Sequence, residues 1–201
     1  MKLQPRKHCR ICFQAIIAFC AVSLFSCTAP LVQYYPDTFY KQDCIYENRA
    51  IGFTLTYRGT WDLETEPSQM SSGNRAFARE LNRNGLELLY VGSTAEGFHG
   101  TRAIAANLNE PVMAYAKRIR NFNLEDNSSD SGLVPFDTEK GKWVKWVYEK
   151  SSFRFVEFFC RIETMNIRVA FWSTPEMFDR FLPVYEEIVH SMTVGRIPGR
   201  N

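Results

Sequence analysis

The chain has 201 residues, of which 45% are hydrophobic and 14% aromatic, so it can bury a large core and is unlike a disordered protein. Its formal net charge is +2, but four basic and no acidic residues precede Cys27, which leaves 20 basic and 22 acidic residues after them, a net charge of −2. A balance so close to neutral argues against a nucleic-acid-binding protein, which usually carries a basic face or stripe.

A leader opens the chain. Residues 1–10 carry the four basic side chains, and residues 11–26 are almost entirely apolar. The apolar run of about 16 residues is shorter than the roughly 20 that a membrane-spanning helix needs. We therefore expect residues 1–26 to be a secretory signal peptide, whose positive end stays in the cytoplasm. An uncleaved signal anchor is the alternative.

The end of the leader resembles the lipobox of bacterial lipoproteins. Leu24-Phe25-Ser26-Cys27 has an aliphatic residue three positions before a cysteine and a small residue just before it, although Phe25 is bulkier than usual there. The resemblance implies cleavage before Cys27 and lipidation of its thiol. Several acyl chains are needed for a stable anchor, because each buried CH₂ contributes only about 0.8 kcal/mol. We expect an envelope protein anchored to the outer or plasma membrane and facing away from the cytoplasm.

The mature chain divides into three parts. Residues 27–44 contain two prolines and several polar side chains, which favours a tether. Residues 45–195 carry the strand and helix patterns of a single domain, and residues 196–201 are expected to form a frayed tail.

Six cysteines bear on redox and metal chemistry. Cys9 and Cys12 form a C-x-x-C pair, but they lie in the leader without a second pair. Cys27 is assigned to the lipid. An oxidising compartment permits a disulfide between Cys44 and Cys160, and the alternative is two buried free thiols, because sequence does not supply the geometry.

The first half of the domain is predicted to consist mainly of strands. Residues 52–57 alternate apolar and polar side chains, which predicts a strand. Residues 75–81 and 86–92 carry two further strand patterns, and Asn84-Gly85 between them is typical of a hairpin turn. Residues 93–107 are expected to form a long polar connection.

The second half begins with a predicted helix. Asn109-Glu110-Pro111 is a helix-start signal, and apolar residues then recur at helical spacing up to Phe122, which predicts a core stripe. Residues 123–132 read as a polar loop. Three strands are expected next, over 143–148, 153–162 and 167–171, as an antiparallel meander with apolar side chains on both faces.

A final helix is predicted from Ser173 onward, because apolar residues recur every three or four positions up to Met192. Pro183 interrupts this stripe, so we expect a kink or two short helices. Together these elements predict an α+β domain in which helices cover both faces of an antiparallel β-sheet, an α/β/α sandwich.

The order of elements resembles the PsbP/Mog1-like family. GFTLTY over 52–57 followed by Trp61 is similar to the family's opening motif, with Arg58 where proline is usual. MFDRFL over 177–182, running on to IVHSM over 188–192, is similar to its closing helix. The resemblance spans about residues 45–194 and implies a sheet sandwiched by helices. It carries over no catalytic residue and implies a binding or assembly factor.

Metal and cofactor motifs are lacking. Only His99 and His190 follow the leader, which excludes a histidine-rich metal site. Residues 126–137 are superficially similar to a calcium loop, but Ser131 replaces the required glycine and the terminal glutamate is absent. With no P-loop or dinucleotide fingerprint either, we predict no metal and no cofactor.

One loop offers an alternative with chemistry. Glu96 lies three residues before His99, and Ser93, Thr94 and Thr101 supply hydroxyls nearby. Such a set could serve a hydrolase, but no G-x-S-x-G elbow positions a nucleophile, and an ordinary solvated loop is the simpler interpretation.

The sequence therefore favours an envelope lipoprotein that acts as a non-enzymatic binding or accessory module, with a membrane partner through Cys27, envelope proteins as further candidates, and no catalytic residue. The alternatives are an envelope hydrolase built on the loop around His99 and a purely structural lipoprotein.

Overall fold

The computed structural model describes residues 37–124 and 129–195. The predicted signal peptide, Cys27 and the predicted tail over 196–201 lie outside these residues. Within them, no helix is both long and apolar enough to cross a membrane.

Seven strands form the larger sheet, in the order β4-β5-β6-β10-β9-β8-β7, with every neighbouring pair antiparallel. The predicted meander is confirmed as β8, β9 and β10. The strands are β4 (Trp61–Glu64), β5 (Leu86–Thr94), β6 (His99–Ala106), β7 (Ser129–Thr138), β8 (Gly141–Lys150), β9 (Phe153–Ile162) and β10 (Met165–Ser173).

Four short strands form a second sheet, in the order β1-β2-β3-β11. They are β1 (Asp37–Tyr40), β2 (Ile45–Asn48), β3 (Phe53–Thr56) and β11 (Thr193–Val194). Because β1 pairs along its length with β2, residues 37–40 belong to the folded domain, and the predicted tether over 27–44 extends too far.

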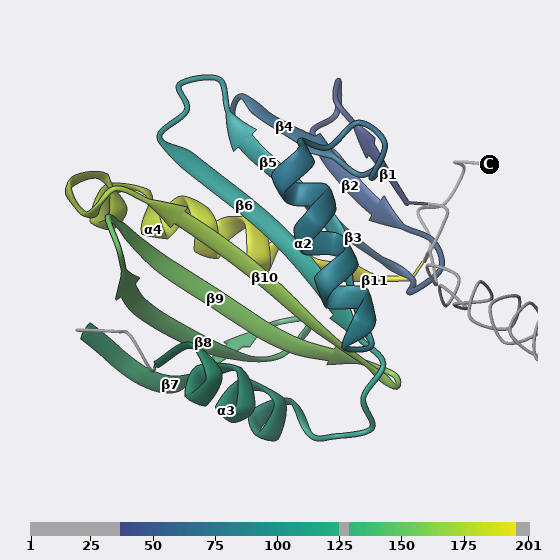
Figure 1. The fold of residues 1–201 in the computed structure, drawn as a ribbon, viewed down its shortest axis with the longest axis vertical. Coiled ribbons are helices and arrows are strands. Elements are labelled where there is room, and N and C mark those ends of the chain that lie inside the picture. The colour runs from purple at the N-terminus through teal and green to yellow at the C-terminus, as the bar shows by residue number, and fades with distance from the viewer. Residues whose placement is uncertain (1–36, 125–128, 196–201) are drawn as a thin grey trace, which may run out of the picture. The chain divides into compact units, whose positions relative to one another are not determined.

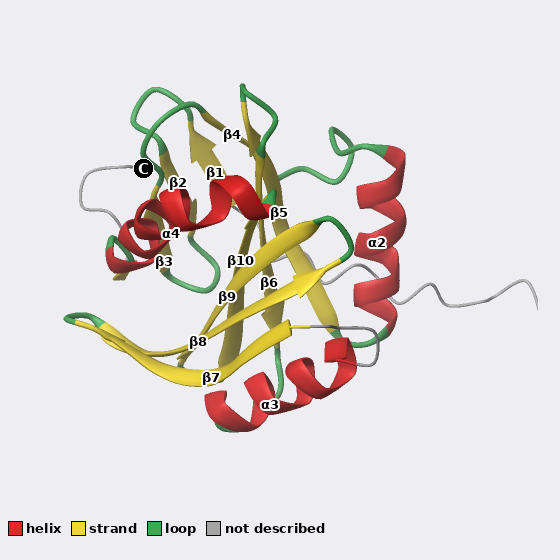
Figure 2. Cartoon of the chain, turned by 90° about the vertical axis from the view of Figure 1, so that its left-hand side faces the viewer, coloured by secondary structure: helices red, strands yellow, loops and turns green. Residues whose placement is uncertain are grey.

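Three described helices cover the larger sheet on both sides (Figures 1 and 2). We call the side under α2 (Ser72–Arg83) and α3 (Val112–Asn123) the outer face. We call the opposite side, under α4 (Pro175–His190) and the smaller sheet, the inner face. The predicted α+β class with antiparallel sheets is confirmed. The inner face differs from the expected sandwich because a second sheet joins the helix there.

The inner face holds the largest core. Phe171, Phe178, Tyr185 and Trp61 are buried together there, and the rings of Phe171 and Tyr185 stack with centroids 4.9 Å apart. Large rings bury much apolar surface, which is why α4 and the small sheet remain attached to this side. The outer face instead carries two separate apolar clusters, one under α2 and one under α3.

Residues 75–81 were predicted as a strand, and this prediction is wrong. They lie in α2, where the Ser71 side chain accepts the N–H of Asn74 as an N-cap. Ala78 and Leu81 are buried and lie three apart, so one helical stripe meets the sheet. Gly85 has a positive φ of 71° and follows the end of α2, so Asn84-Gly85 ends a helix rather than forming a hairpin.

Four smaller expectations also fail, one of them in part. The long polar connection expected over residues 93–107 is mostly strand β6, which is largely buried. Residues 129–132 of the predicted polar loop belong to β7. Phe122 was placed in the core stripe of α3, but its side chain is 80% exposed, while Tyr115 and Ile119 are buried as expected. Pro183 was expected to cause a kink or two short helices; α4 is one continuous helix, so the second form of this expectation is wrong, and Pro183 lies on its exposed side.

Candidate functional site

The outer face between α2 and α3 gathers unusual polar side chains. Helix α2 lies against β5, whereas α3 lies against β8 and β9, so strand β10 runs between them. Along β10, Ile167, Val169 and Phe171 enter the inner core, and Arg168 and Ala170 alternate with them. The space between the helices in Figure 1 therefore corresponds to a strand whose outward residues include a buried charge.

Arg168 forms a buried ion pair with Glu157 of β9. The Arg168 Nε donates to Glu157 Oε2 at 2.7 Å, and a second guanidinium nitrogen donates to Oε1. The Tyr148 hydroxyl of β8 also donates to Oε1, at 2.7 Å. Burial lowers the pKa of Arg168, but the adjacent Glu157 carboxylate outweighs it and raises the pKa overall. This forked, three-donor arrangement satisfies a carboxylate that has no exposed surface.

Arg102 of β6 lies on the same face without such a partner. In the register of the sheet, Arg102 pairs with Ala170, which in turn pairs with Glu157. Its guanidinium lies between two aromatic rings, 5.1 Å from the centroid of Phe77 and 5.7 Å from that of Trp172. Its Nε is buried and has no hydrogen-bond partner among the described residues. Burial, and then repulsion from Arg168, lower the pKa of Arg102.

Tyr115 of α3 brings a second buried polar group. Its ring packs edge-on against Phe159, and its hydroxyl has no hydrogen-bond partner in the described part of the chain. Burial raises the pKa of Tyr115 to about 12, and Arg168 and Glu157 are its strongest electrostatic neighbours. The hydroxyl therefore stays protonated at neutral pH and can donate a hydrogen bond.

A row of neighbouring aromatic rings crosses this face, and we call it the aromatic ladder: Trp146 and Tyr148 on β8, Phe155 on β9 and Trp172 on β10. Consecutive ring centroids are 3.9, 5.0 and 5.9 Å apart. Phe155 and Trp172 are only partly buried. The Trp172 ring packs directly over Gly100, where any added Cβ would collide with ring atoms. The ladder ends beside Arg102.

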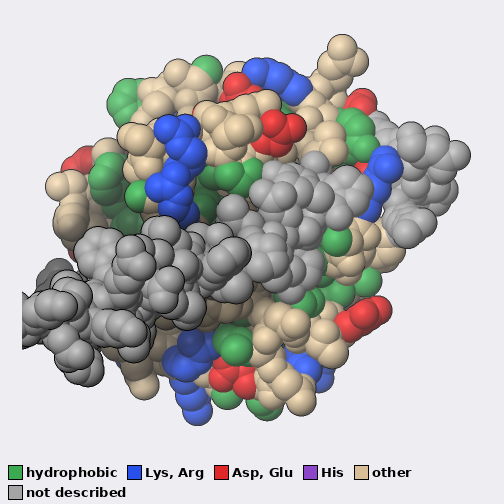
Figure 3. Space-filling view, turned by 45° about the vertical axis from the view of Figure 1, so that its right-hand side comes forward, with side chains coloured by type: hydrophobic (Ala, Val, Ile, Leu, Met, Phe, Trp, Pro, Cys, Tyr) green, Lys and Arg blue, Asp and Glu red, His purple; other side chains and the backbone are tan. Residues whose placement is uncertain are grey.

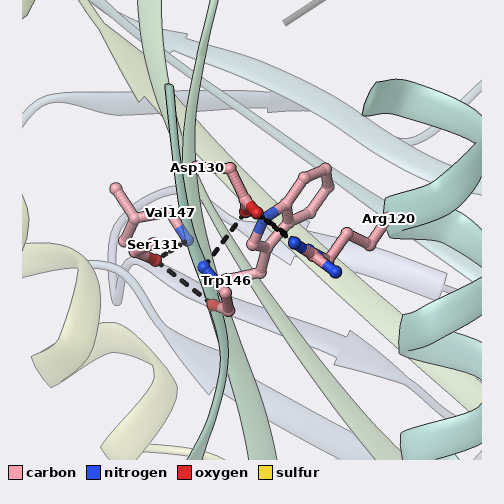
Figure 4. Close-up of polar contacts among 6 residues, drawn as sticks. Arg120, Asp130, Ser131, Trp146 and Val147 are labelled. Carbon is pink, nitrogen blue, oxygen red and sulfur yellow. Dashed lines mark hydrogen bonds and ion pairs between the residues drawn. The ribbon is translucent and has the colours of Figure 1, made fainter. Parts of the chain in front are cut away.

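The far end of the ladder is fixed by polar contacts (Figure 4). Asp130 of β7 accepts from the Trp146 indole and from Arg120 of α3. Burial alone would raise the pKa of Asp130, but the hydrogen bonds from Arg120 and Trp146 lower it overall. Ser131 accepts the N–H of Val147. This arrangement orients Trp146 and ties α3 to the edge of the sheet.

The structure does not assemble the hydrolase set proposed around His99. Nδ1 of His99 lies 2.7 Å from the Tyr185 hydroxyl, whereas Glu96 accepts from Thr60 at 3.1 Å and Thr101 lies 3.3 Å from Tyr57. Burial lowers the pKa of His99, against the opposing effect of Glu96. His99 is thus a core imidazole bonded to a tyrosine.

The remaining predicted residues are resolved as follows. Cys44 and Cys160 are both free thiols, and burial raises the pKa of Cys160. A raised thiol pKa makes a cysteine inert at neutral pH. No group of three potential metal-ligating side chains occurs in residues 37–124 and 129–195.

Comparison with solved structures identifies a similar fold. Cyanobacterial PsbP (CyanoP) from Synechocystis sp. PCC 6803 superposes with a TM-score of 0.52 at 9% identity, covering 75% of this chain and 91% of that chain. The chain has a PsbP-like fold. A protein from Bacteroides thetaiotaomicron VPI-5482 has a TM-score of 0.40 at 13% identity, over 74% of this chain and 46% of that chain. No family model and no curated protein sequence matches the chain.

Strand register explains why the sequence analysis missed the outer-face residues. Glu157 lies between Val156 and Phe158, and Arg168 between Ile167 and Val169, on strands whose other face is mostly apolar. A charge within such a strand was the available signal, since charged residues are almost never fully buried unless paired. Which charges meet depends on strand register, which the sequence did not reveal.

Proposed function

We propose that the protein is an envelope lipoprotein, anchored through Cys27, whose PsbP-like domain is a non-enzymatic module that binds its ligand on the outer face between α2 and α3. The leader and the Leu24–Cys27 motif support the anchor. The fold supplies two sheet faces, of which the inner is filled by its own aromatic core.

One observation supports the binding role most strongly: Arg102 keeps a buried, unpartnered Nε beside partly exposed aromatic rings. Leaving a buried donor unsatisfied costs about 1–3 kcal/mol, and more for a charged group. Natural structures contain few such groups, and each needs a physical explanation; a bond supplied by a ligand is the explanation that the proposal adopts for Arg102.

The anchor is tested by mass analysis of the mature N-terminus and by cell fractionation. We expect a lipid adduct on Cys27 and recovery in the membrane fraction, and a Cys27→Ser variant that stays unprocessed. Normal maturation and membrane retention of Cys27→Ser would contradict the proposal.

The binding face is tested separately, by placing a photo-crosslinking amino acid at Phe155 in cells. Phe155 is partly exposed on the outer face, and the matched control is Phe122, which is exposed on α3. An adduct at position 155 that is absent at position 122 is expected. Equal labelling at both positions would count against the outer face.

A further inference from the structure

The charges on the outer face do not balance. Arg168 is neutralised by Glu157, and Arg118 of α3 by Glu110, with 2.6 Å between their nearest nitrogen and oxygen. Arg102 has no ion pair among the described residues, although Glu157 attracts it and Arg168 repels it. Arg161 of β9 also has no ion pair among the described residues, but it donates to three oxygen atoms, so Arg102 is the less satisfied of these two cations.

Two buried hydrogen-bond donors on this face have no acceptor among the described residues. The Arg102 Nε comes from β6 and the Tyr115 hydroxyl from α3, and both groups interact electrostatically with the Arg168–Glu157 pair between them. Ala170 lies between Arg102 and Glu157 in the sheet register. Its small side chain rises less far above the sheet than the side chains of these two neighbours. An acceptor group bound beside Ala170 would be placed for Arg102, which is partly exposed, whereas Tyr115 is fully buried.

Apolar side chains surround the same guanidinium. Phe77 and Trp172 flank Arg102, and Phe155 continues the aromatic ladder from Trp172. All four of these side chains retain partial exposure to solvent. A ligand that reaches Arg102 therefore also contacts aromatic surface, which favours a planar or apolar body.

We propose that the outer face binds a small monocarboxylate with an apolar body, whose carboxylate accepts from Arg102 and whose body packs on Trp172 and Phe155. This inference rests on the proposed binding role of that face. A monocarboxylate neutralises the single charge of the Arg102 guanidinium, whereas a phosphate dianion would bring a second negative charge that this guanidinium leaves unpaired. A planar carboxylate also fits the fork of a guanidinium, as Glu157 does on Arg168.

The test uses the full chain in non-ionic detergent and three probes: benzoate, its neutral analogue benzamide, and inorganic phosphate. Calorimetric titration should show that benzoate binds at least roughly tenfold more tightly than benzamide, because one charge-assisted hydrogen bond is worth about 1.5–3 kcal/mol. Equal affinity for benzoate and benzamide, or tighter binding of phosphate, would overturn the proposal.

Variants locate the site. Arg102→Gln should reduce benzoate affinity about tenfold, to the level of benzamide. The matched control Arg79→Gln removes the same charge from the exposed side of α2 and should leave affinity unchanged. Unchanged benzoate binding in Arg102→Gln would show that Arg102 serves only to fill space between two rings, and would overturn the proposal.

Trp172→Leu supplies an independent variant should Arg102→Gln unfold. Trp172 is partly exposed, so the fold should persist, while loss of the ring on which the ligand body packs should lower benzoate affinity several-fold. Undiminished affinity in Trp172→Leu would contradict the assignment. Because none of these measurements involves Cys27, their failure would leave the anchor untouched, and loss of the anchor would leave them valid.

Discussion

The two faces of the larger sheet handle buried polar groups differently. On the inner face, the Tyr57 hydroxyl bonds to Tyr90 and the His99 imidazole bonds to Tyr185, although the indole N–H of Trp143 has no partner among the described residues. On the outer face, a charged group, the Arg102 guanidinium, keeps a buried Nε without a partner among the described residues. An unpartnered charged group costs more than a neutral one, so Arg102 is the group that points to binding on the outer face.

The largest effect should come from the buried Arg168–Glu157 ion pair of the outer face. Glu157→Ala leaves Arg168 charged and unpaired, and removing one partner of a buried pair costs about 3–5 kcal/mol. Urea denaturation measures this. The control Asp62→Ala breaks the exposed pair with Lys41 and should cost less than about 1 kcal/mol. Equal losses in the two variants would show that the Arg168–Glu157 pair is not buried in solution.

Adjacent residues on β10 sharpen the contrast between the faces. Phe171 is fully buried on the inner face, and Phe171→Ala should cost about 3–5 kcal/mol in the free energy of unfolding. Trp172 is partly exposed on the outer face, so Trp172→Ala should cost clearly less despite the larger side chain removed. A larger loss for Trp172 would make the outer face the main core and reverse the comparison.

The inner face should also respond to pH. Burial lowers the pKa of His99 below its ordinary value of 6.5, so below pH 6.5 the unfolded state binds the proton more readily than the folded state. His99 therefore reduces stability as pH falls from 7 to 5.5, by at most roughly 1.4 kcal/mol per pH unit. Chemical denaturation across this range should show a shallower decline for His99→Gln, with exposed His190→Gln as the control. An unchanged slope in His99→Gln would place the imidazole in solvent.

The smallest expected change in stability comes from removing the hydroxyl of one of two tyrosines. Tyr57→Phe removes a hydroxyl that bonds to Tyr90 and Thr101, and should cost about 1–2 kcal/mol. Tyr115→Phe removes a hydroxyl without a partner among the described residues, and should be neutral or slightly stabilising. Thermal unfolding of the two variants gives the comparison. A substantial loss for Tyr115→Phe would mean that its hydroxyl is already satisfied.

The sequence predicted an element correctly where the spacing of apolar residues within that element was sufficient to define it. The alternation in residues 153–162 predicted β9, and the spacing from Phe178 to Val189 predicted α4. It failed at α2, where the pair Asn84-Gly85 fits both a hairpin and a helix end, so the local signal was ambiguous. The outer-face site was out of reach, because Arg102, Tyr115 and Glu157 come from three separate elements and meet only in the folded chain.

The most direct test of a binding outer face is a crystal structure of the mature protein soaked in 4-bromobenzoate, with the bromine located by its anomalous signal. We expect a single strong peak over Trp172 or Phe155, with the carboxylate against the Arg102 guanidinium. Bromine peaks confined to other surfaces, with Arg102 still enclosed by Phe77 and Trp172 alone, would contradict the account.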